Sequence, residues 1–344
     1  MKRKIFCSGS AGMMCSYFVD YLIDNYGDKY EIYGADDFSG SYRENVNPKC
    51  KFKEIDLRKT EDVDHYFFMN FRNRDLDYMI LTAAAAQEIR SFFSPIYNAS
   101  INDDTAKNCI VNGLRYGVKH IVFLSSMSRY GRGSGPLPFK ESYFPLPDDP
   151  YASSKVYIEN FIKALSNVHD FTYTIFVPHN AFSPRQYVDA QRNFIAIWFN
   201  LILMGKDCYI YGDGKQERAI SWVSDYCPVI CDSLFNEKTY GEVINIGGDI
   251  PYTLNELYEM VCEVSGWNRP AIHIDPRPGE VKYAWTDHSL ARKLTGFENK
   301  THILDALSEM WEYFKNKGPR PFVYYNEWEI DSPKIPITWR NKLF

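Results

Sequence analysis

The chain has 344 residues, of which 45% are hydrophobic and 24% are charged, as in an ordinary globular protein with a sizeable core. Its net charge of −5 gives no broad basic surface, so we expect no nucleic-acid partner. The longest apolar run, 194–204, is about half of the ~20 residues that span a bilayer, so we expect a buried helix there and no membrane segment.

The first predicted elements are a strand at 4–7, a glycine-rich turn and a helix that includes 17–23. No apolar leader precedes the strand, so we expect no secretory signal and a cytoplasmic location. Backbone N–H groups of such a turn, at the positive end of a helix, bind a diphosphate. The turn positions that we expect to face a dinucleotide are Gly9, Ser10, Ala11, Gly12, Met13 and Met14. Cys15 stands where the pattern has its third glycine, and being small and apolar it is compatible with an intact fold.

Two acids, Asp36 and Asp37, follow a second predicted strand at 30–33. An acid at the tip of this strand accepts hydrogen bonds from a ribose diol and repels a 2′-phosphate. The sequence therefore favours NAD over NADP.

Strands and helices alternate through about residue 177, with helices predicted at 97–116 and 151–165 and strands at 121–124 and 173–177. This alternation predicts an α/β fold of the Rossmann type, a doubly wound parallel sheet with right-handed crossovers. We expect a dinucleotide-binding domain over 1–177 with returning segments near 221–250. A smaller lobe would occupy most of 178–318, and 319–344 would form an extended tail.

Tyr151 and Lys155 lie four residues apart on the predicted helix, one turn from each other on one face. A phenol is a poor base at neutral pH, but a nearby ammonium stabilises the phenolate and lowers its pKa. Tyr151 could then take a proton from an alcohol while a hydride leaves the adjoining carbon. The hydroxyl of Ser126 would hold the same alcohol oxygen. Alone, the spacing is common, and an ordinary helix surface is the alternative.

Together these residues resemble the extended short-chain dehydrogenase/reductase family, in its NAD-dependent nucleotide-sugar epimerase and dehydratase branch. The resemblance runs over nearly the whole chain and in the family's order. The segments that carry it are 8–12, 56–57, 78–84, Asn102, 123–131, 151–155, 178–180, 183–186, 212–218, 245–248 and 277–280.

The resemblance implies roles for individual residues. Ser126, Tyr151 and Lys155 would be catalytic, and Lys155 would also contact NAD. Further cofactor contacts would come from Asp56, Leu57, Thr82, Ala83, Ala84, Asn102 and Pro178. Substrate contacts would come from Ser126, Ser128, Asn180, Arg185, Arg218 and Arg277. Arg218 and Arg277 would clamp the diphosphate, because a guanidinium fork matches phosphate oxygens.

Departures from the family pattern narrow the expected reaction. In the 4,6-dehydratases an Asp-Glu pair follows the catalytic hydroxyl, whereas here Met127 and Ser128 follow Ser126. This argues against a dehydratase. It also makes a decarboxylase a weaker alternative, because decarboxylation in this family uses an acid near the same position. Val177 stands where related epimerases often have Arg, so a substrate or domain contact made by that Arg is not expected here.

The expected function is therefore that of an NAD-dependent nucleotide-sugar 4-epimerase. C4 would be oxidised transiently, and hydride would return to the opposite face of a 4-keto sugar. The alternatives are a net dehydrogenase or ketoreductase on the same substrates and an idle nucleotide-sugar-binding protein.

The eight cysteines form no CxxC pair and the seven histidines no HxxxH pair, so we expect no metal site. The helices at 97–116 and 151–165 resemble a pair that forms the dimer interface in this family. We therefore expect a homodimer, with Ile110, Leu114, Ile158 and Ile162 as candidate apolar contacts. Each of these four residues could equally serve the core of the protomer.

Overall fold

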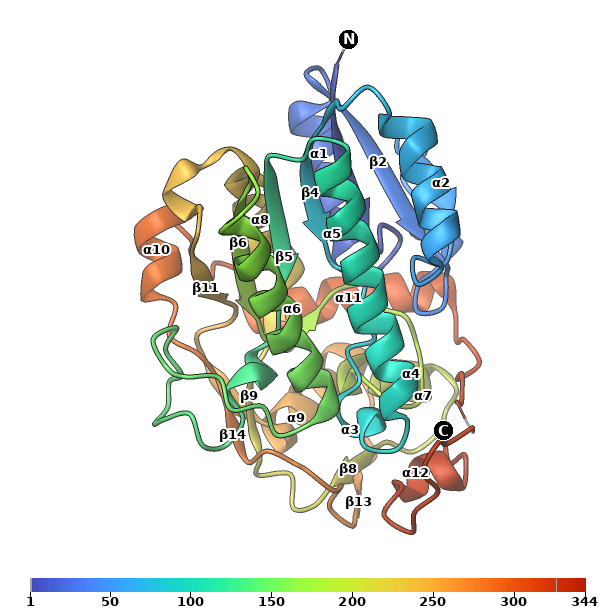
Figure 1. Cartoon of the computed structure of the whole chain (residues 1–344). Coiled ribbons are helices and arrows are strands. Elements are labelled where there is room, and N and C mark those ends of the chain that lie inside the picture. The colour runs from blue at the N-terminus through green and yellow to red at the C-terminus, as the bar shows by residue number, and fades with distance from the viewer. Residues whose placement is uncertain (1, 326) are drawn as a thin grey trace.

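A seven-stranded parallel sheet forms the centre of the protein, in a computed structural model that describes residues 2–325 and 327–344 (Figure 1). The strand order is β11-β6-β5-β4-β1-β2-β3, and each neighbouring pair is parallel. The chain starts in the middle of the sheet, moves to one edge and then returns to build the other, as in a doubly wound fold. The strands are β1 (Arg3–Ser8), β2 (Tyr30–Asp36), β3 (Lys51–Glu54), β4 (Leu76–Leu81), β5 (His120–Leu124), β6 (Thr172–Pro178) and β11 (Val243–Ile246).

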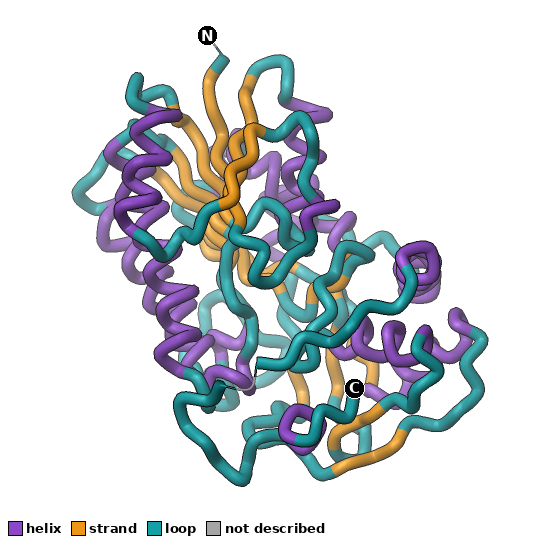
Figure 2. Tube along the Cα trace, turned by 90° about the vertical axis from the view of Figure 1, so that its right-hand side faces the viewer, coloured by secondary structure: helices purple, strands orange, loops and turns teal. Residues whose placement is uncertain are grey.

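Helices cover both faces of the sheet, as Figure 2 shows with the strands seen between two layers of helix. Apolar side chains of the sheet join two separate cores, one on each face. One face carries α2 (Thr60–Phe71), α5 (Thr105–Arg115) and α6 (Pro150–Ser166). The other carries α1 (Cys15–Tyr26), α8 (Val223–Asp232) and α10 (Ser289–Thr295). The predicted fold class is confirmed, and α8 and β11 lie within the segment that we expected to return to the large domain.

The helix predicted at 97–116 is interrupted. It consists of α4 (Pro95–Ala99), a π-helical segment Ser100–Asp104 and α5, and the short α3 (Glu88–Ser91) precedes it. Single π-helical turns within an α-helix occur frequently at functional sites.

A smaller lobe with its own apolar core lies below the carboxyl ends of the strands. Its helices are α7 (Phe194–Leu203), α9 (Leu254–Ser265) and α11 (Ile303–Lys317). Its strands are β7 (Ala181–Phe182), β8 (Tyr209–Tyr211), β9 (Glu217–Ala219), β10 (Ser221–Trp222), β12 (Pro251–Thr253), β13 (Ile272–Ile274) and β14 (Tyr283–Ala284). Helix α7 is buried, and no helix of the described residues is long and apolar enough to cross a membrane.

The proposed apolar dimer contacts lie inside the protomer. Ile110, Ile158 and Ile162 are at most 1% exposed and belong to the core between α5, α6 and the sheet, while Leu114 packs against that core. These side chains stabilise the protomer and offer no surface to a second copy. The homodimer itself stays a prediction.

The tail over 319–344 folds back onto the lobe and ends near the short helix α12 (Ile337–Arg340), which the sequence did not predict. One of its contacts is with Arg90, which follows β4 by nine residues. The Arg90 guanidinium lies 4.2 Å from the ring centre of Tyr97 and 4.0 Å from that of Tyr325, in a cation–π sandwich. The tail is therefore packed against the large domain.

Trp339→Ala should lower the free energy of unfolding by about 3 kcal/mol, since Trp339 is 2% exposed in a small core with Phe93 and Ile335. Ile337→Ala is the matched control on the same helix, because Ile337 is 49% exposed and its loss should stay within about 0.5 kcal/mol. Urea denaturation measures both. Equal effects of the two changes would show that the tail is not packed as described.

Candidate active site

A cavity of about 500 Å³ runs from the glycine-rich turn after β1 to the smaller lobe. It opens at the carboxyl ends of the parallel strands, where α/β proteins bind ligands. Its wall combines the turn, the ends of β2, β4, β5 and β6, the start of α6 and parts of the lobe and tail.

The glycine-rich turn packs tightly against the end of β4. Gly9 has a φ of +68°, and a Cβ there would come within 2.9 Å of the Ala83 Cα. The Ser8 hydroxyl oxygen accepts hydrogen bonds from the N–H groups of Thr82 and Ala83, at 3.1 and 3.2 Å. A side chain at position 9 would therefore be strained and would push β4 away from the turn. Cys15, at the third-glycine position, is buried in the same core as β1.

Asp36 at the end of β2 is buried and organises this part of the cavity. Its carboxylate accepts hydrogen bonds from the Ala11 N–H at 3.1 Å, the Phe38 N–H at 2.8 Å and the Ser41 hydroxyl at 2.7 Å. Burial raises the pKa of Asp36, although these hydrogen bonds oppose the shift. Asp36 and Asp37 both line the cavity.

Asp56 lines the cavity too, but its carboxylate is held by Arg58. The Arg58 Nε and Nη2 donate to its two oxygens at 2.9 and 2.8 Å. This bond lowers the pKa of Asp56. The Leu57 side chain lies beside it on the cavity wall.

Asn102 lies behind the cavity wall. Its Oδ1 accepts a hydrogen bond from the Ala85 N–H at 2.8 Å, and its Nδ2 donates to the Asn98 Oδ1 at 2.8 Å. Asn102 itself does not line the cavity, but through Ala85 it holds the segment after β4. Thr82 and Ala84 of that segment do line the cavity. Ser10 and Ala11 are likewise buried within the turn.

Ser126, Tyr151 and Lys155, the three residues with a predicted catalytic role, line one part of the cavity. Ser126 follows β5, while Asp149 caps α6 by accepting a hydrogen bond from the Ala152 N–H at 2.8 Å. With Pro150 at the first position, this cap begins the helix so that Tyr151 and Lys155 share its inner face. The Ser126 hydroxyl oxygen accepts a hydrogen bond from the Ser128 hydroxyl at 2.8 Å.

Burial outweighs the effect that we expected Lys155 to have on Tyr151. Burial, reinforced by the charge of Glu88, raises the pKa of Tyr151, while the nearby Ser126 hydroxyl opposes this. The Lys155 ammonium donates to the Leu124 carbonyl at 2.9 Å, and its Nζ lies 5.9 Å from the Tyr151 ring centre. Burial lowers the pKa of Lys155 to about 8. Burial therefore disfavours the Tyr151 phenolate in the protein alone.

A buried acid lies on helix α6 one turn beyond Lys155. Glu159, one turn after Lys155, is 1% exposed, pairs with Arg129 at 3.0 Å and accepts a hydrogen bond from Ser125. Its charge opposes the effect of burial on Lys155 and favours the ammonium form. The sequence interpretation missed this residue, although its spacing of four from Lys155 would have placed it on the same helix face.

Arg218 and Arg277 meet at the lobe end of the cavity and share Glu280. The Arg218 Nη2 lies 2.6 Å from one oxygen of Glu280, and the Arg277 Nε and Nη2 lie 2.9 and 2.7 Å from the other. Burial disfavours the Glu280 carboxylate, but Arg277 and Arg218 outweigh it and lower its pKa. Two cations share one anion here, so the cluster keeps a net positive charge for an anionic ligand.

Of two other predicted substrate residues, Asn180 lines the cavity and Arg185 does not. Asn180 lines the cavity with a φ of +42°, and its Nδ2 donates to the Ala219 carbonyl at 3.0 Å. Arg185 does not line it: its Nη2 pairs with Asp20 at 2.6 Å, and its guanidinium lies over the Tyr17 ring at 4.4 Å. Its partners lie on α1, which the sequence alone could not bring beside residue 185.

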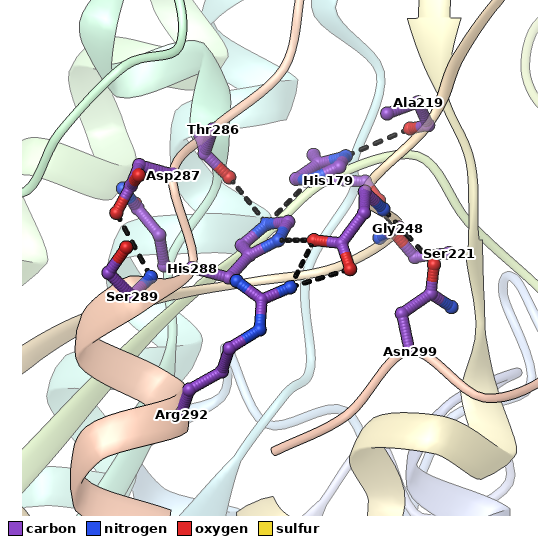
Figure 3. Close-up of polar contacts among 12 residues, drawn as sticks. His179, Ala219, Ser221, Gly248, Thr286, Asp287, His288, Ser289, Arg292 and Asn299 are labelled. Atoms are coloured by element: carbon purple, nitrogen blue, oxygen red, sulfur yellow. Dashed lines mark hydrogen bonds and ion pairs between the residues drawn. The ribbon is translucent and has the colours of Figure 1, made fainter. Parts of the chain in front are cut away.

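A histidine pair holds the segment after β6 in place (Figure 3). The His179 Nδ1 donates to the Ala219 carbonyl at 2.9 Å, and burial lowers the pKa of His179 to about 3, so its Nε2 is unprotonated. The His288 Nε2 lies 3.1 Å from that atom and 2.9 Å from the Thr286 hydroxyl oxygen. The His288 Nδ1 donates to Asp249, at 2.8 Å, since bonds from His288 and Arg292 lower the pKa of that carboxyl to about 2.

His288 is buried, and its ring contacts His179, Thr286 and Asp249. It joins the end of β6 to Asp249 and α10, and so fixes the backbone that presents Pro178 and Asn180 to the cavity.

Several cavity residues had not been predicted. Glu88 and Asp149 add carboxylates close to Tyr151, and Arg192 adds a cation that lowers the pKa of that phenol. Only Asp149 carries a sequence signal, an Asp before Pro at a helix start. Among residues 2–325 and 327–344 no cluster of metal-binding side chains occurs.

Comparison with known proteins assigns the family. Residues 5–247 match the NAD dependent epimerase/dehydratase family. The chain belongs to this family. The predicted family relationship is confirmed, and the protein is an NAD-dependent enzyme.

Individual members of the family are similar over nearly the whole chain. A Methanocaldococcus jannaschii protein provisionally named a UDP-glucose 4-epimerase is 28% identical over 91% of this chain and 99% of its own. The structure of Thermotoga maritima UDP-glucose 4-epimerase with UDP-glucose has a TM-score of 0.84 and 27% identity, and covers 91% of this chain and 99% of that one. The Methanobrevibacter ruminantium UDP-N-acetylglucosamine 4-epimerase, in complex with UDP-N-acetylmuramic acid, has a TM-score of 0.80 and 26% identity, with 92% and 100% covered.

The cavity of this epimerase/dehydratase family member fits NAD on its own geometry. Gly9 leaves no room for a side chain where the turn approaches Ala83, and Gly12, Met13 and Met14 line the space in front of the helix. The buried Asp36 provides a carboxylate at the far end of this space. Lys155 and Pro178 lie toward the catalytic end.

Proposed function

We propose that the protein is a nucleotide-sugar 4-epimerase. The observation that carries the proposal is one cavity lined by Ser126, Tyr151 and Lys155, with a dinucleotide turn at one end and the Arg218–Arg277 pair at the other. Relatives similar over at least nine-tenths of the chain are named as 4-epimerases of UDP-sugars. We take a UDP-hexose as the first substrate to test.

In the proposed reaction, Tyr151 accepts the proton of the sugar 4-hydroxyl. NAD, when bound, would supply a hydride acceptor and a positive charge. The Ser126 hydroxyl hydrogen-bonds the same sugar oxygen. The Lys155 ammonium stabilises the phenolate, which burial otherwise disfavours. Tyr151 returns the proton when the 4-keto sugar is reduced on its other face.

The diphosphate must stay bound while the sugar turns over. Arg218 and Arg277 are positioned for this, because their shared carboxylate, Glu280, keeps both guanidinium groups in the wall and leaves net positive charge. Asn180 contacts a phosphate or sugar oxygen in this proposal.

The test is incubation of the purified protein with UDP-, GDP-, CDP- and dTDP-sugars without added NAD, followed by sugar analysis. We expect one nucleotide series to give a mixture of C4 epimers. Conversion only when nicotinamide is supplied, with net oxidation or reduction, would favour a dehydrogenase or ketoreductase with the same three residues. No conversion with any sugar would contradict the proposal.

Three further points stay predictions: a homodimer in solution, a cytoplasmic location and a role in carbohydrate biosynthesis. Light scattering at micromolar protein measures the first.

A further inference from the structure

The short helix α3 is fixed between the two halves of the proposed substrate site. The Tyr151 N–H donates to the Ser91 hydroxyl at 3.2 Å. On the other side, a Cβ at Gly279 would come within 2.9 Å of the Phe92 ring, so this turn between Arg277 and Glu280 touches the end of α3. Helix α3 thus connects the general base with the arginine pair.

Glu88 is the first residue of α3, and its exposed side chain lines the cavity. Within the described part of the chain its carboxylate has no ion pair and no hydrogen bond from another side chain. Glu88, Tyr151, Asp149, Arg218 and Arg277 all line this cavity. The negative charge of Glu88 adds to the effect of burial that raises the pKa of Tyr151 and Asp149, and it favours the charged forms of the two arginines. A sugar that extends from the arginine pair to Tyr151 would share the cavity with this carboxylate.

The cations near this gap already have partners. The Arg192 Nε pairs with Asp189 at 2.9 Å, and the Arg132 Nε pairs with Asp148 at 3.0 Å. The Lys155 ammonium donates to a backbone carbonyl. Arg218 and Arg277 are required for the diphosphate in the proposed function.

Asp149 adds to the negative character of this region. Burial and the charge of Glu88 raise its pKa to about 7, so it is partly ionised at neutral pH. A sugar carboxylate would therefore meet the negative charges of Glu88 and Asp149, while the nearby Arg192 and Arg132 already pair with acids of their own.

We propose that Glu88 sets the substrate class of this site, by accepting a hydrogen bond from a hydroxyl or amino group of the sugar and excluding sugars that carry a carboxylate. This inference rests on the proposed function, because it takes the gap between Tyr151 and the arginine pair as the sugar site. It selects neutral hexoses and amino sugars over uronates.

The test compares binding of UDP-glucose and UDP-glucuronate to the protein as purified, by isothermal titration calorimetry. The wild type should bind UDP-glucose at least about tenfold more tightly than UDP-glucuronate. Glu88→Gln keeps the shape and removes the charge, and should reduce this ratio at least about fivefold, chiefly through tighter binding of UDP-glucuronate. Glu88→Asp should keep the discrimination. Glu61→Gln, on the exposed start of α2, changes the net charge equally and should leave the ratio unchanged.

An unchanged ratio in Glu88→Gln, a wild-type preference for UDP-glucuronate, or binding of neither sugar would overturn the inference. Turnover is measured separately on the same proteins. A Glu88-dependent binding ratio without epimerisation would leave the selectivity standing and defeat the proposed reaction. Epimerisation with a binding ratio that does not depend on Glu88 would support the proposed reaction and overturn the selectivity inference.

Discussion

Tyr151→Phe should lower turnover at least about 100-fold, the lower range for loss of a general acid–base group, and should leave the cofactor bound. Phenylalanine fills the same buried volume, since Tyr151 is 4% exposed, but it has no oxygen to take the sugar proton. The loss should appear in kcat, because the phenol acts in the proton transfer and contributes little to binding of the nucleotide.

Turnover and retained cofactor are measured on the same preparation. Tyr157→Phe is the matched control, because Tyr157 lies on the same helix and is 46% exposed. It should keep nearly full activity. If Tyr151→Phe turned over substrate as fast as this control, Tyr151 would not be the base.

Lys155→Met should abolish most activity and also stabilise the protein at pH 7, by about 2 kcal/mol. Burial lowers the pKa of Lys155 from its ordinary 10.5 to about 8, which corresponds to about 3 kcal/mol of cost for the buried ammonium. Loss of the hydrogen bond to Leu124 offsets about 1 kcal/mol of that gain.

The stabilisation has a predicted dependence on pH. Between pH 8 and 10.5 the folded wild type binds fewer protons at Lys155 than the unfolded chain, so its stability rises with pH through this window. The advantage of Lys155→Met should therefore be full below pH 8 and disappear by about pH 10.5. Lys206→Met, at an exposed position, should show no such trend. Urea denaturation across this pH range measures the difference in stability between Lys155→Met and the wild type. A Lys155→Met variant that is less stable than the wild type at pH 7 would contradict this prediction.

The sequence predicted the fold class correctly because its signals are local. The apolar strand before Gly9, the acid Asp36 after the second strand and the Tyr151–Lys155 spacing each depend on a few neighbouring residues. Right-handed parallel crossovers then bring these segments to the same edge of the sheet. The cavity shows Ser126, Tyr151 and Lys155 together, as expected.

Contacts between distant segments were not predictable in the same way. Arg185 faces Asp20 and not the cavity, and Ile158 faces the sheet and not a partner, because only the folded packing decides which side each residue takes. Glu88 carries no motif and reaches the site through the placement of α3. Although no acid follows Ser126 in the sequence, the folded chain brings the carboxylates of Glu88 and Asp149 into the same cavity.

The central claim is that the protein interconverts C4 epimers with no net redox change. The most direct measurement follows the absorbance of reduced nicotinamide while the protein, as purified, reacts with UDP-glucose or the sugar selected by the panel, with sugar analysis of the same samples. The account predicts steady formation of the C4 epimer in both directions and no lasting absorbance change. Persistent cofactor reduction, or release of a keto sugar, would contradict it.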